Sequence, residues 1–216
     1  MEKYLNYIKD EIAKILDIEL RDVLMVEIDC YILNWNKHKN EAVPSPIYNR
    51  IPELYNKHNF NFHTGESISI SWDIDALYDF AINNLPISYM EFQKLTSLLG
   101  HDLSNSAEEI DRVRAEVNSK QSHKYQPLLI MQYKPLNTYL LIDGRHRYIE
   151  YEKFNQTVDI PIYVVDDEKA IEAICLNNEL MAYIIMHNIE VINNILIGKE
   201  FTFGRILNVD RCMKLT

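Results

Sequence analysis

The fold of this chain is decided by residues 127–148, PLLIMQYKPLNTYLLIDGRHRY. Two apolar runs, separated by a polar turn, have the length and composition of β-strands. The second run stops at Asp143-Gly144, and the residues after it have helical character. A third apolar run follows this helix. The predicted elements are two strands, a helix and a third strand, at 127–133, 139–142, 145–154 and 160–165.

This order of elements predicts an α+β protein. Apolar residues at three- and four-residue steps predict an amphipathic helix over 3–17. Further helices are predicted from about 71–75, where acids fall in a first turn, and over 106–117. Asp166–Glu168 are predicted to cap a largely helical tail that extends to about Leu196.

Residues 24–33 alternate between two faces with the period of a β-strand. One face is apolar and is predicted to lie in the core, whereas the other carries the carboxylates of Glu27 and Asp29. A general base or a magnesium ligand needs this arrangement, although a solvated sheet face has the same pattern. Glu27 and Asp29 are therefore candidate catalytic residues.

The turn from the second strand into the helix carries a cluster of basic residues. Backbone N–H groups at the start of a helix have no partner within it, and the helix dipole adds a partial positive charge there. Arg145, His146 and Arg147 add two full charges and a titratable donor, and Gly144 allows a close backbone approach. Asp143 is placed to cap the helix, to hold a magnesium ion or to bind a substrate hydroxyl. We predict a site for a phosphate or another oxyanion, with a capped surface helix as the alternative.

This box and its surroundings resemble the ParB/sulfiredoxin superfamily. The resemblance is carried by Leu140–Tyr148, by the strand 160–165 after the helix, and by Gln126-Pro127 before the first strand. The Asp-Gly-x-His-Arg form of the box is closest to a free-serine-kinase branch of that superfamily. The resemblance implies a single domain over 1–216 with a small mixed sheet. Its core comprises about 24–36 and 104–166. A helical insertion covers about 37–103, and a helical tail covers about 168–216.

The resemblance also implies roles for residues. Gly144, Arg145, His146 and Arg147 match the positions that bind nucleotide phosphates, and His146 is also a catalytic candidate. Asp143 matches a catalytic or metal-linked carboxylate, and the first-strand carboxylate of the kinase-like branch corresponds to Glu27 or Asp29. The implied ligands are ATP, ADP or CTP, Mg²⁺ and a small acceptor that bears a hydroxyl group.

The first functional hypothesis is a magnesium-dependent phosphotransferase or NTPase. Sulfiredoxin activity is excluded, because Arg145 stands where that chemistry needs a cysteine nucleophile. The alternatives are a nucleotide-gated or DNA-associated module of plasmid or phage function that does not catalyse a reaction, and a ParB-like nuclease. A nuclease needs a basic track that this composition does not supply.

Composition and charge narrow these classes. The chain has 22 Lys and Arg against 32 Asp and Glu, a formal charge of −10, which argues against DNA or anionic lipid as a partner. No apolar run approaches the roughly 20 residues of a membrane span. Three cysteines far apart predict buried thiols in a cytoplasmic protein. The apolar stretch 180–197 predicts either a core helix or the surface of a homodimer.

Four histidines are candidate metal ligands: His38, His58, His63 and His123. None has the i, i+4 spacing of a helical metal site. His58 and His63, with the aromatic residues between them, are weak candidates for a substrate pocket in the insertion. Ordinary packing is the alternative.

Overall fold

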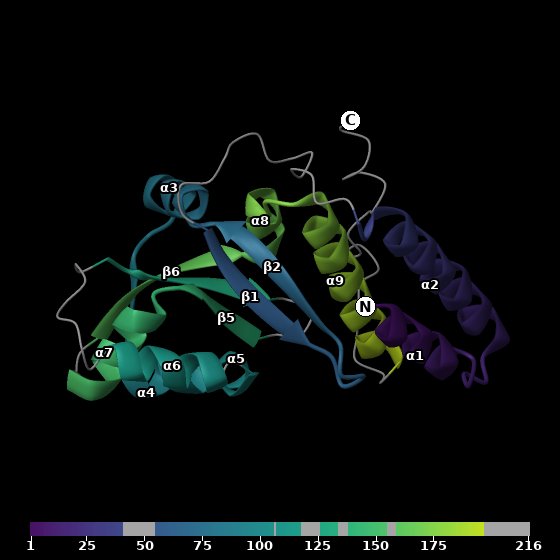
Figure 1. Ribbon diagram of the computed structural model, residues 1–216, viewed down its shortest axis with the longest axis horizontal. Coiled ribbons are helices and arrows are strands. Elements are labelled where there is room, and N and C mark those ends of the chain that lie inside the picture. Colours follow the sequence, from purple (N-terminus) through teal and green to yellow (C-terminus); the bar gives the residue numbers. More distant parts are fainter. Residues whose placement is uncertain (41–54, 106, 118–125, 134–137, 155–158, 197–216) are drawn as a thin grey trace. The chain divides into compact units, whose positions relative to one another are not determined.

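A computed structural model gives the fold of the protein (Figure 1). It describes residues 1–40, 55–105, 107–117, 126–133, 138–154 and 159–196. These residues combine helices with small sheets, which confirms the predicted α+β class. The chain divides into two compact units, each described here by itself. Unit 1 comprises Met1–Ile51, Lys57–Ser71 and Ile174–Thr216, and unit 2 comprises Pro52–Asn56 and Trp72–Ala173.

Unit 2 is built on a mixed sheet. Its strands are β3 (Ser88–Glu91), β4 (Leu128–Tyr133), β5 (Thr138–Asp143) and β6 (Asp159–Asp166). The strand order is β3-β6-β4-β5, with β4 parallel to β6 and both outer strands antiparallel to their neighbours. The three strands predicted around residues 127–165 are therefore confirmed.

Helices cover both faces of this sheet (Figure 1). One face carries α4 (Phe92–Leu98), α6 (Ala107–Val117) and α7 (Arg145–Phe154), and the other carries α3 (Ile74–Asn84) and α8 (Asp167–Ala170). The short helices α5 (Gly100–Asn105) and η2 (Ile171–Ala173) complete the unit. Because both faces are covered, consecutive residues of β4 are buried, and Leu128 to Met131 are all fully buried.

Local signals explain where these helices begin. The Asp73 carboxylate accepts a hydrogen bond from the Ala76 amide at 2.9 Å and so caps α3. Asp166 caps α8 in the same way, through the Glu168 amide at 2.9 Å. The start of α3 was predicted from acids in the first turn, and the cap at Asp166 was predicted for the helical tail, which the structure divides into α8, the short helix η2 and α9 (Asn177–Leu196).

Unit 1 packs three helices and most of a hairpin. The helices are α1 (Glu2–Ile12), α2 (Ile18–His38) and α9 (Asn177–Leu196), and the hairpin strands are β1 (Tyr55–Asn61) and β2 (Ser67–Asp73). Both α1 and α9 contact α2. Residues 180–189 of α9 are buried throughout, so this apolar stretch forms core.

The strand predicted over 24–33 is wrong, because these residues lie inside the long helix α2. The Asp17 carboxylate starts this helix by accepting a hydrogen bond from the Leu20 amide at 3.0 Å. Apolar residues occur on both faces of α2, so their pattern satisfies a period of two as well as a period of 3.6. Cys30 is exposed on α2, contrary to the expected buried thiol, whereas Cys175 is buried.

The range 37–103, expected to be a helical insertion, also contains strands. It includes the β1–β2 hairpin and β3, which joins the sheet of unit 2 beside β6. β3 has four residues, too few for a period-two signal. The part of the predicted tail after Leu196 lies outside the described residues. None of the helices in the described part of the chain has a stretch that could cross a lipid bilayer.

Candidate functional site

The candidate site is the corner between β5 and α7. Gly144 joins the two elements with φ +104°, a conformation that side-chain-bearing residues rarely adopt. The Gly144 carbonyl accepts the first hydrogen bond of α7, from the Tyr148 amide at 2.8 Å. Gly144 is therefore the N-cap residue of α7, and the next three residues form its first turn.

The space beside Gly144 is filled by its neighbours. A Cβ atom at this position would lie 2.5 Å from Leu128 Cδ2 and 3.0 Å from Arg147 Nη2. Leu128 is fully buried in the core of unit 2, so it has little room to move. The corner therefore requires glycine for its backbone conformation and for its packing.

Arg147 holds this corner together from inside. Its Nη1 donates to the carbonyls of Gln126 at 2.9 Å and Pro127 at 3.3 Å. Its Nη2 donates to the Tyr78 hydroxyl at 2.9 Å and to Asp143 Oδ2 at 2.5 Å. The residue is 8% exposed. Sequence reasoning predicts Arg147 as a phosphate ligand, but the structure engages its guanidinium with four oxygen atoms of the protein.

Tyr78 is the residue of this cluster that sequence reasoning missed. It lies on the buried face of α3, and its hydroxyl is 3.1 Å from Asp143 Oδ2 and 2.9 Å from the Pro127 carbonyl. Burial, together with the negative charge of Asp143, raises the pKa of Tyr78 far above its ordinary value. The hydroxyl therefore stays protonated and keeps a donor for one of these two acceptors. A tyrosine on an otherwise apolar helix face was the available signal.

Replacing Tyr78 with phenylalanine tests this cluster. Tyr78→Phe removes one donor from Pro127 or Asp143 and one acceptor from Arg147, while the ring and its packing remain. We expect the free energy of unfolding to fall by about 1–2 kcal/mol in urea titrations. Tyr89→Phe is the matched control, because Tyr89 is 66% exposed. Equal stability of the Tyr78→Phe and Tyr89→Phe proteins would contradict a structural role for the Tyr78 hydroxyl.

The first turn of α7 is basic and contains no acid. Arg145 is 6% exposed, and His146 is half-buried. The positive end of a helix dipole disfavours cations in the first turn, and burial adds a desolvation cost. Sequences that break a local rule in this way do so most often at functional sites. Phosphate binding by Gly144, Arg145 and His146 stays a prediction.

Asp143 presents its two carboxylate oxygens differently. Oδ2 lies within hydrogen-bonding distance of both Arg147 and Tyr78, and the side chain is 28% exposed. Oδ1 accepts no hydrogen bond from the residues that the structure describes. A partly exposed carboxylate beside a basic helix start suits either a proton acceptor or a ligand of a magnesium ion whose other ligands are water and phosphate.

The other two predicted carboxylates lie outside this sheet. Glu27 and Asp29 belong to α2 in unit 1, whereas the corner belongs to unit 2. Asp29 forms an ion pair with Lys9 of α1. Because the strand predicted over 24–33 is a helix, the argument that placed Glu27 and Asp29 on the sheet of the corner no longer holds.

A further carboxylate lies on β3, the edge strand opposite β5, which ends at the exposed Glu91. Glu91 pairs with Asp159 at the start of β6, and Asp143 pairs with Leu129 near the start of β4. Because β4 and β6 are parallel, Glu91 and Asp143 lie toward the same end of the strands, although they belong to opposite edge strands. The two central strands separate them. A four-residue strand left no signal by which this carboxylate could have been found.

The predicted histidine sites are not assembled by the residues that the structure describes. His38 is buried in α2, and His63 is exposed and packs its ring against Tyr4 and Tyr7. The side chain of His58 and all of His123 lie outside the described residues. No histidine in the described part of the chain joins a cluster with metal-ligand geometry.

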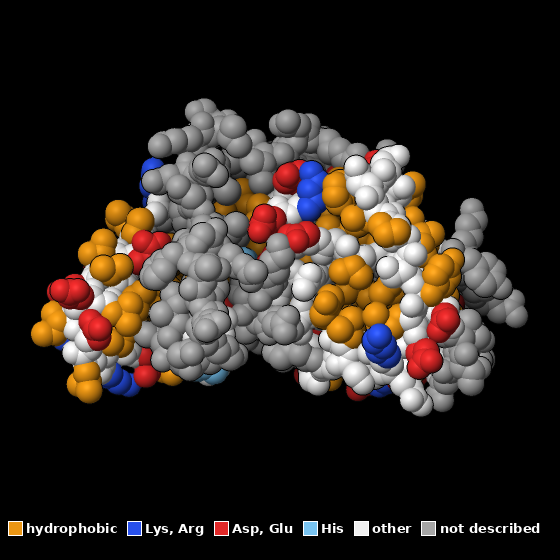
Figure 2. All heavy atoms as spheres, turned by 180° about the vertical axis from the view of Figure 1, so that it is seen from behind, with side chains coloured by type: hydrophobic (Ala, Val, Ile, Leu, Met, Phe, Trp, Pro, Cys, Tyr) orange, Lys and Arg blue, Asp and Glu red, His pale blue; other side chains and the backbone are white. Residues whose placement is uncertain are grey.

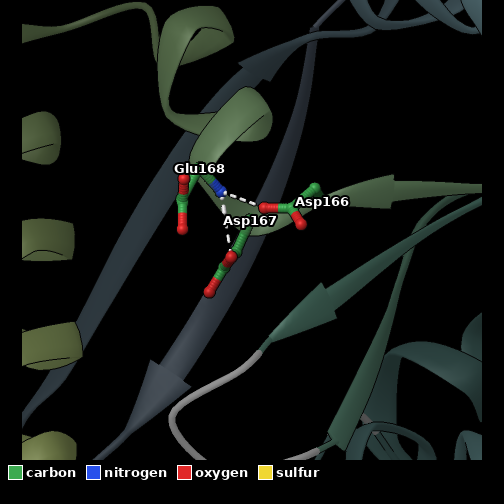
Figure 3. Close-up of side chains that lie close together, drawn as sticks. All are labelled: Asp166, Asp167 and Glu168. Atoms are coloured by element: carbon green, nitrogen blue, oxygen red, sulfur yellow. Dashed lines mark hydrogen bonds between the residues drawn. The ribbon is translucent and has the colours of Figure 1, made fainter. Parts of the chain in front are cut away.

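Asp166, Asp167 and Glu168 form a compact acidic cluster (Figure 3). One carboxylate oxygen from each lies within 4.8 Å of the others. The Glu168 amide donates to Asp166 Oδ1 and to Asp167 Oδ1, each at 2.9 Å, so these carboxylates cap α8. Asp166 pairs with Gln132 near the end of β4, whereas Asp143 pairs with Leu129 near its start, so the two carboxylates lie at opposite ends of the strands. The cluster is therefore separate from the corner.

Comparison with protein-family models, with curated proteins and with solved structures finds no match for this chain.

Proposed function

We propose that the β5–α7 corner binds the phosphates of a nucleotide and that the protein is a magnesium-dependent phosphotransferase or NTPase. The observation that carries the proposal is the basic first turn of α7, which directly follows Gly144 at φ +104°. A positive-φ glycine before a helix allows the backbone to approach a phosphate closely. The sheet around this corner, with β4 and β5 antiparallel and β4 and β6 parallel, supports a fold of the ParB/sulfiredoxin type.

Two groups of residues have different tasks in this proposal. The first-turn amides of α7, with Arg145 and His146, bind and neutralise the phosphates. Arg147 and Tyr78 are positioning residues, because their hydrogen bonds hold Asp143 Oδ2. This leaves Oδ1 of Asp143 as the atom that accepts the proton of a small hydroxyl-bearing acceptor. Magnesium, when bound, supplies further charge neutralisation for the phosphates.

Calorimetric titration with ATP, ADP and CTP, with and without magnesium, tests binding. We expect micromolar affinity for at least one nucleotide, and a loss of at least about tenfold in His146→Ala. Lys153→Ala is the matched control, because it removes a basic residue from the last turn of the same helix. It should bind as the unchanged protein does. Absence of binding to all three nucleotides, or equal losses in both variants, would refute the phosphate site.

Turnover distinguishes an enzyme from a nucleotide-gated module. Asp143→Asn retains an oxygen that accepts from Arg147 and Tyr78 but removes the negative charge. We expect this variant to bind nucleotide and to lose about 100-fold or more of its hydrolysis or transfer rate. Glu91→Gln tests the second carboxylate toward this end of the strands. Nucleotide binding without turnover in the unchanged protein would favour the gated module over the enzyme.

A further inference from the structure

Helix α2 has a buried face and an exposed apolar face. Within unit 1 it buries Leu24, Ile28, Tyr31 and His38. The opposite side exposes Val23, Val26 and Leu33 by 59%, 72% and 70%. Helices α1 and α2 lie at the left of Figure 2, where hydrophobic side chains are interspersed with acidic ones. This second face makes no contribution to the core of the unit.

The exposed apolar residues follow a heptad pattern. Val23, Val26, Cys30 and Leu33 are separated by three, four and three residues, the spacing of the contact line of a coiled coil. The same spacing continues to Glu19 at one end and Lys37 at the other, and all six residues are exposed. We call these six residues the α2 seam. A seam of this kind fits one other helix that has the same spacing.

We propose that the α2 seam is a self-association surface, on which α2 of a second copy packs antiparallel about a twofold axis. If the twofold axis crosses the seam at the level of residue 28 along the helix, Val26 pairs with Cys30 of the second copy. The same axis pairs Val23 with Leu33, again one from each copy. The four seam contacts nearest the axis are then apolar, and each pairing occurs twice, as twofold symmetry requires.

Charge selects the antiparallel direction. In this register Glu19 of one copy faces Lys37 of the other, at both ends of the seam. A parallel pair would instead place Glu19 against Glu19 and Lys37 against Lys37. Two acidic residues, Glu27 and Asp29, flank the centre of the seam. Asp29 pairs with Lys9 of its own chain, so its charge is balanced before a second copy approaches, and Glu27 is half-buried.

The seam predicts a reversible dimer of folded monomers. α2 has 21 residues and so is about 31 Å long, which gives a contact at the small end of specific interfaces. The monomer core does not include the seam, so substitutions there change association without unfolding the chain. We expect dissociation constants in the micromolar range.

Light scattering after gel filtration, over a range of protein concentrations, tests the proposal. The mass should rise from 25.5 kDa toward twice that value as the concentration increases. Val26→Glu should remain a monomer, with unchanged circular dichroism. Ile82→Glu is the matched control and should still dimerise, because Ile82 is 61% exposed on α3. A monomer at all concentrations, or dimers of Val26→Glu, would overturn the proposal.

A charge exchange tests the direction. Glu19→Lys places like charges at both ends of the antiparallel seam, and we expect the dimer to weaken about fivefold. Lys37→Glu should weaken it similarly, and the double variant should restore the original affinity. In a parallel dimer each single change replaces one like-charged pair with another, so neither should weaken the dimer. Failure of the double variant to recover would therefore reject the antiparallel register.

Discussion

Gly144→Ala is expected to lower the free energy of unfolding of unit 2 by about 4 kcal/mol. Part of this cost is conformational, because alanine at φ +104° is strained by about 1–3 kcal/mol. The rest comes from the Cβ atom, which would lie 2.5 Å from Leu128 and must displace a packed core side chain. The measurement is urea unfolding in a Trp35→Phe background. The fluorescence of Trp72, a fully buried residue of unit 2, then follows the unfolding transition.

Gly65→Ala separates the two causes. Gly65 also has a positive φ, of +80°, but a Cβ atom there would meet nothing within 4 Å. We expect a loss of about 1 kcal/mol, from backbone strain alone, measured by circular dichroism. If both substitutions cost the same, the packing around Gly144 does not contribute to stability.

Arg147→Ala is expected to lower the free energy of unfolding by about 3–5 kcal/mol. The substitution leaves the Asp143 carboxylate and the Gln126 carbonyl without their cationic donor, in a part of the protein where water replaces it poorly. Arg147→Lys keeps the charge but not the planar fork, so we expect about half of this loss. Both are measured by the Trp72 transition in urea.

Arg114→Ala is the matched control for Arg147→Ala. Arg114 forms a bidentate pair with Glu152, at 2.8 and 3.0 Å, but its side chain is 42% exposed. We expect a loss of about 1 kcal/mol or less, because water can take the place of an exposed partner. A cost for Arg147→Ala as small as that for Arg114→Ala would show that Arg147 is not needed to hold the corner.

Much of unit 2 could be predicted from the sequence because its signals are local. The strands and the helix between 127 and 165 each have an uninterrupted apolar run or a clear cap, and the Asp143-Gly144 turn separates them. The prediction over 24–33 was wrong for a physical reason. A helix with apolar residues on both faces satisfies the strand period too, and the cap at Asp17 was the signal that distinguished them.

The candidate site was predicted only in part. The sequence places Asp143, Gly144 and Arg147 at one turn, because they are neighbours in the chain. It does not show that Arg147 also binds Tyr78, since this contact joins residues 69 positions apart. Pairings at that separation depend on how α3 packs, which no local pattern contains. Arg147 was therefore predicted as a phosphate ligand, whereas in the structure its guanidinium donates hydrogen bonds to oxygen atoms of the protein.

That long separation also has a kinetic consequence. Arg147 connects segments that are 4, 21 and 69 positions away, so the corner closes only after a large loop has been ordered. Contacts of this kind slow folding and form with the tertiary structure rather than before it. A proteolysed chain that lacks α3 would then contain the whole box and still lack the Arg147–Tyr78 contact. The geometry on which the proposed phosphate site depends therefore forms only when the tertiary structure forms.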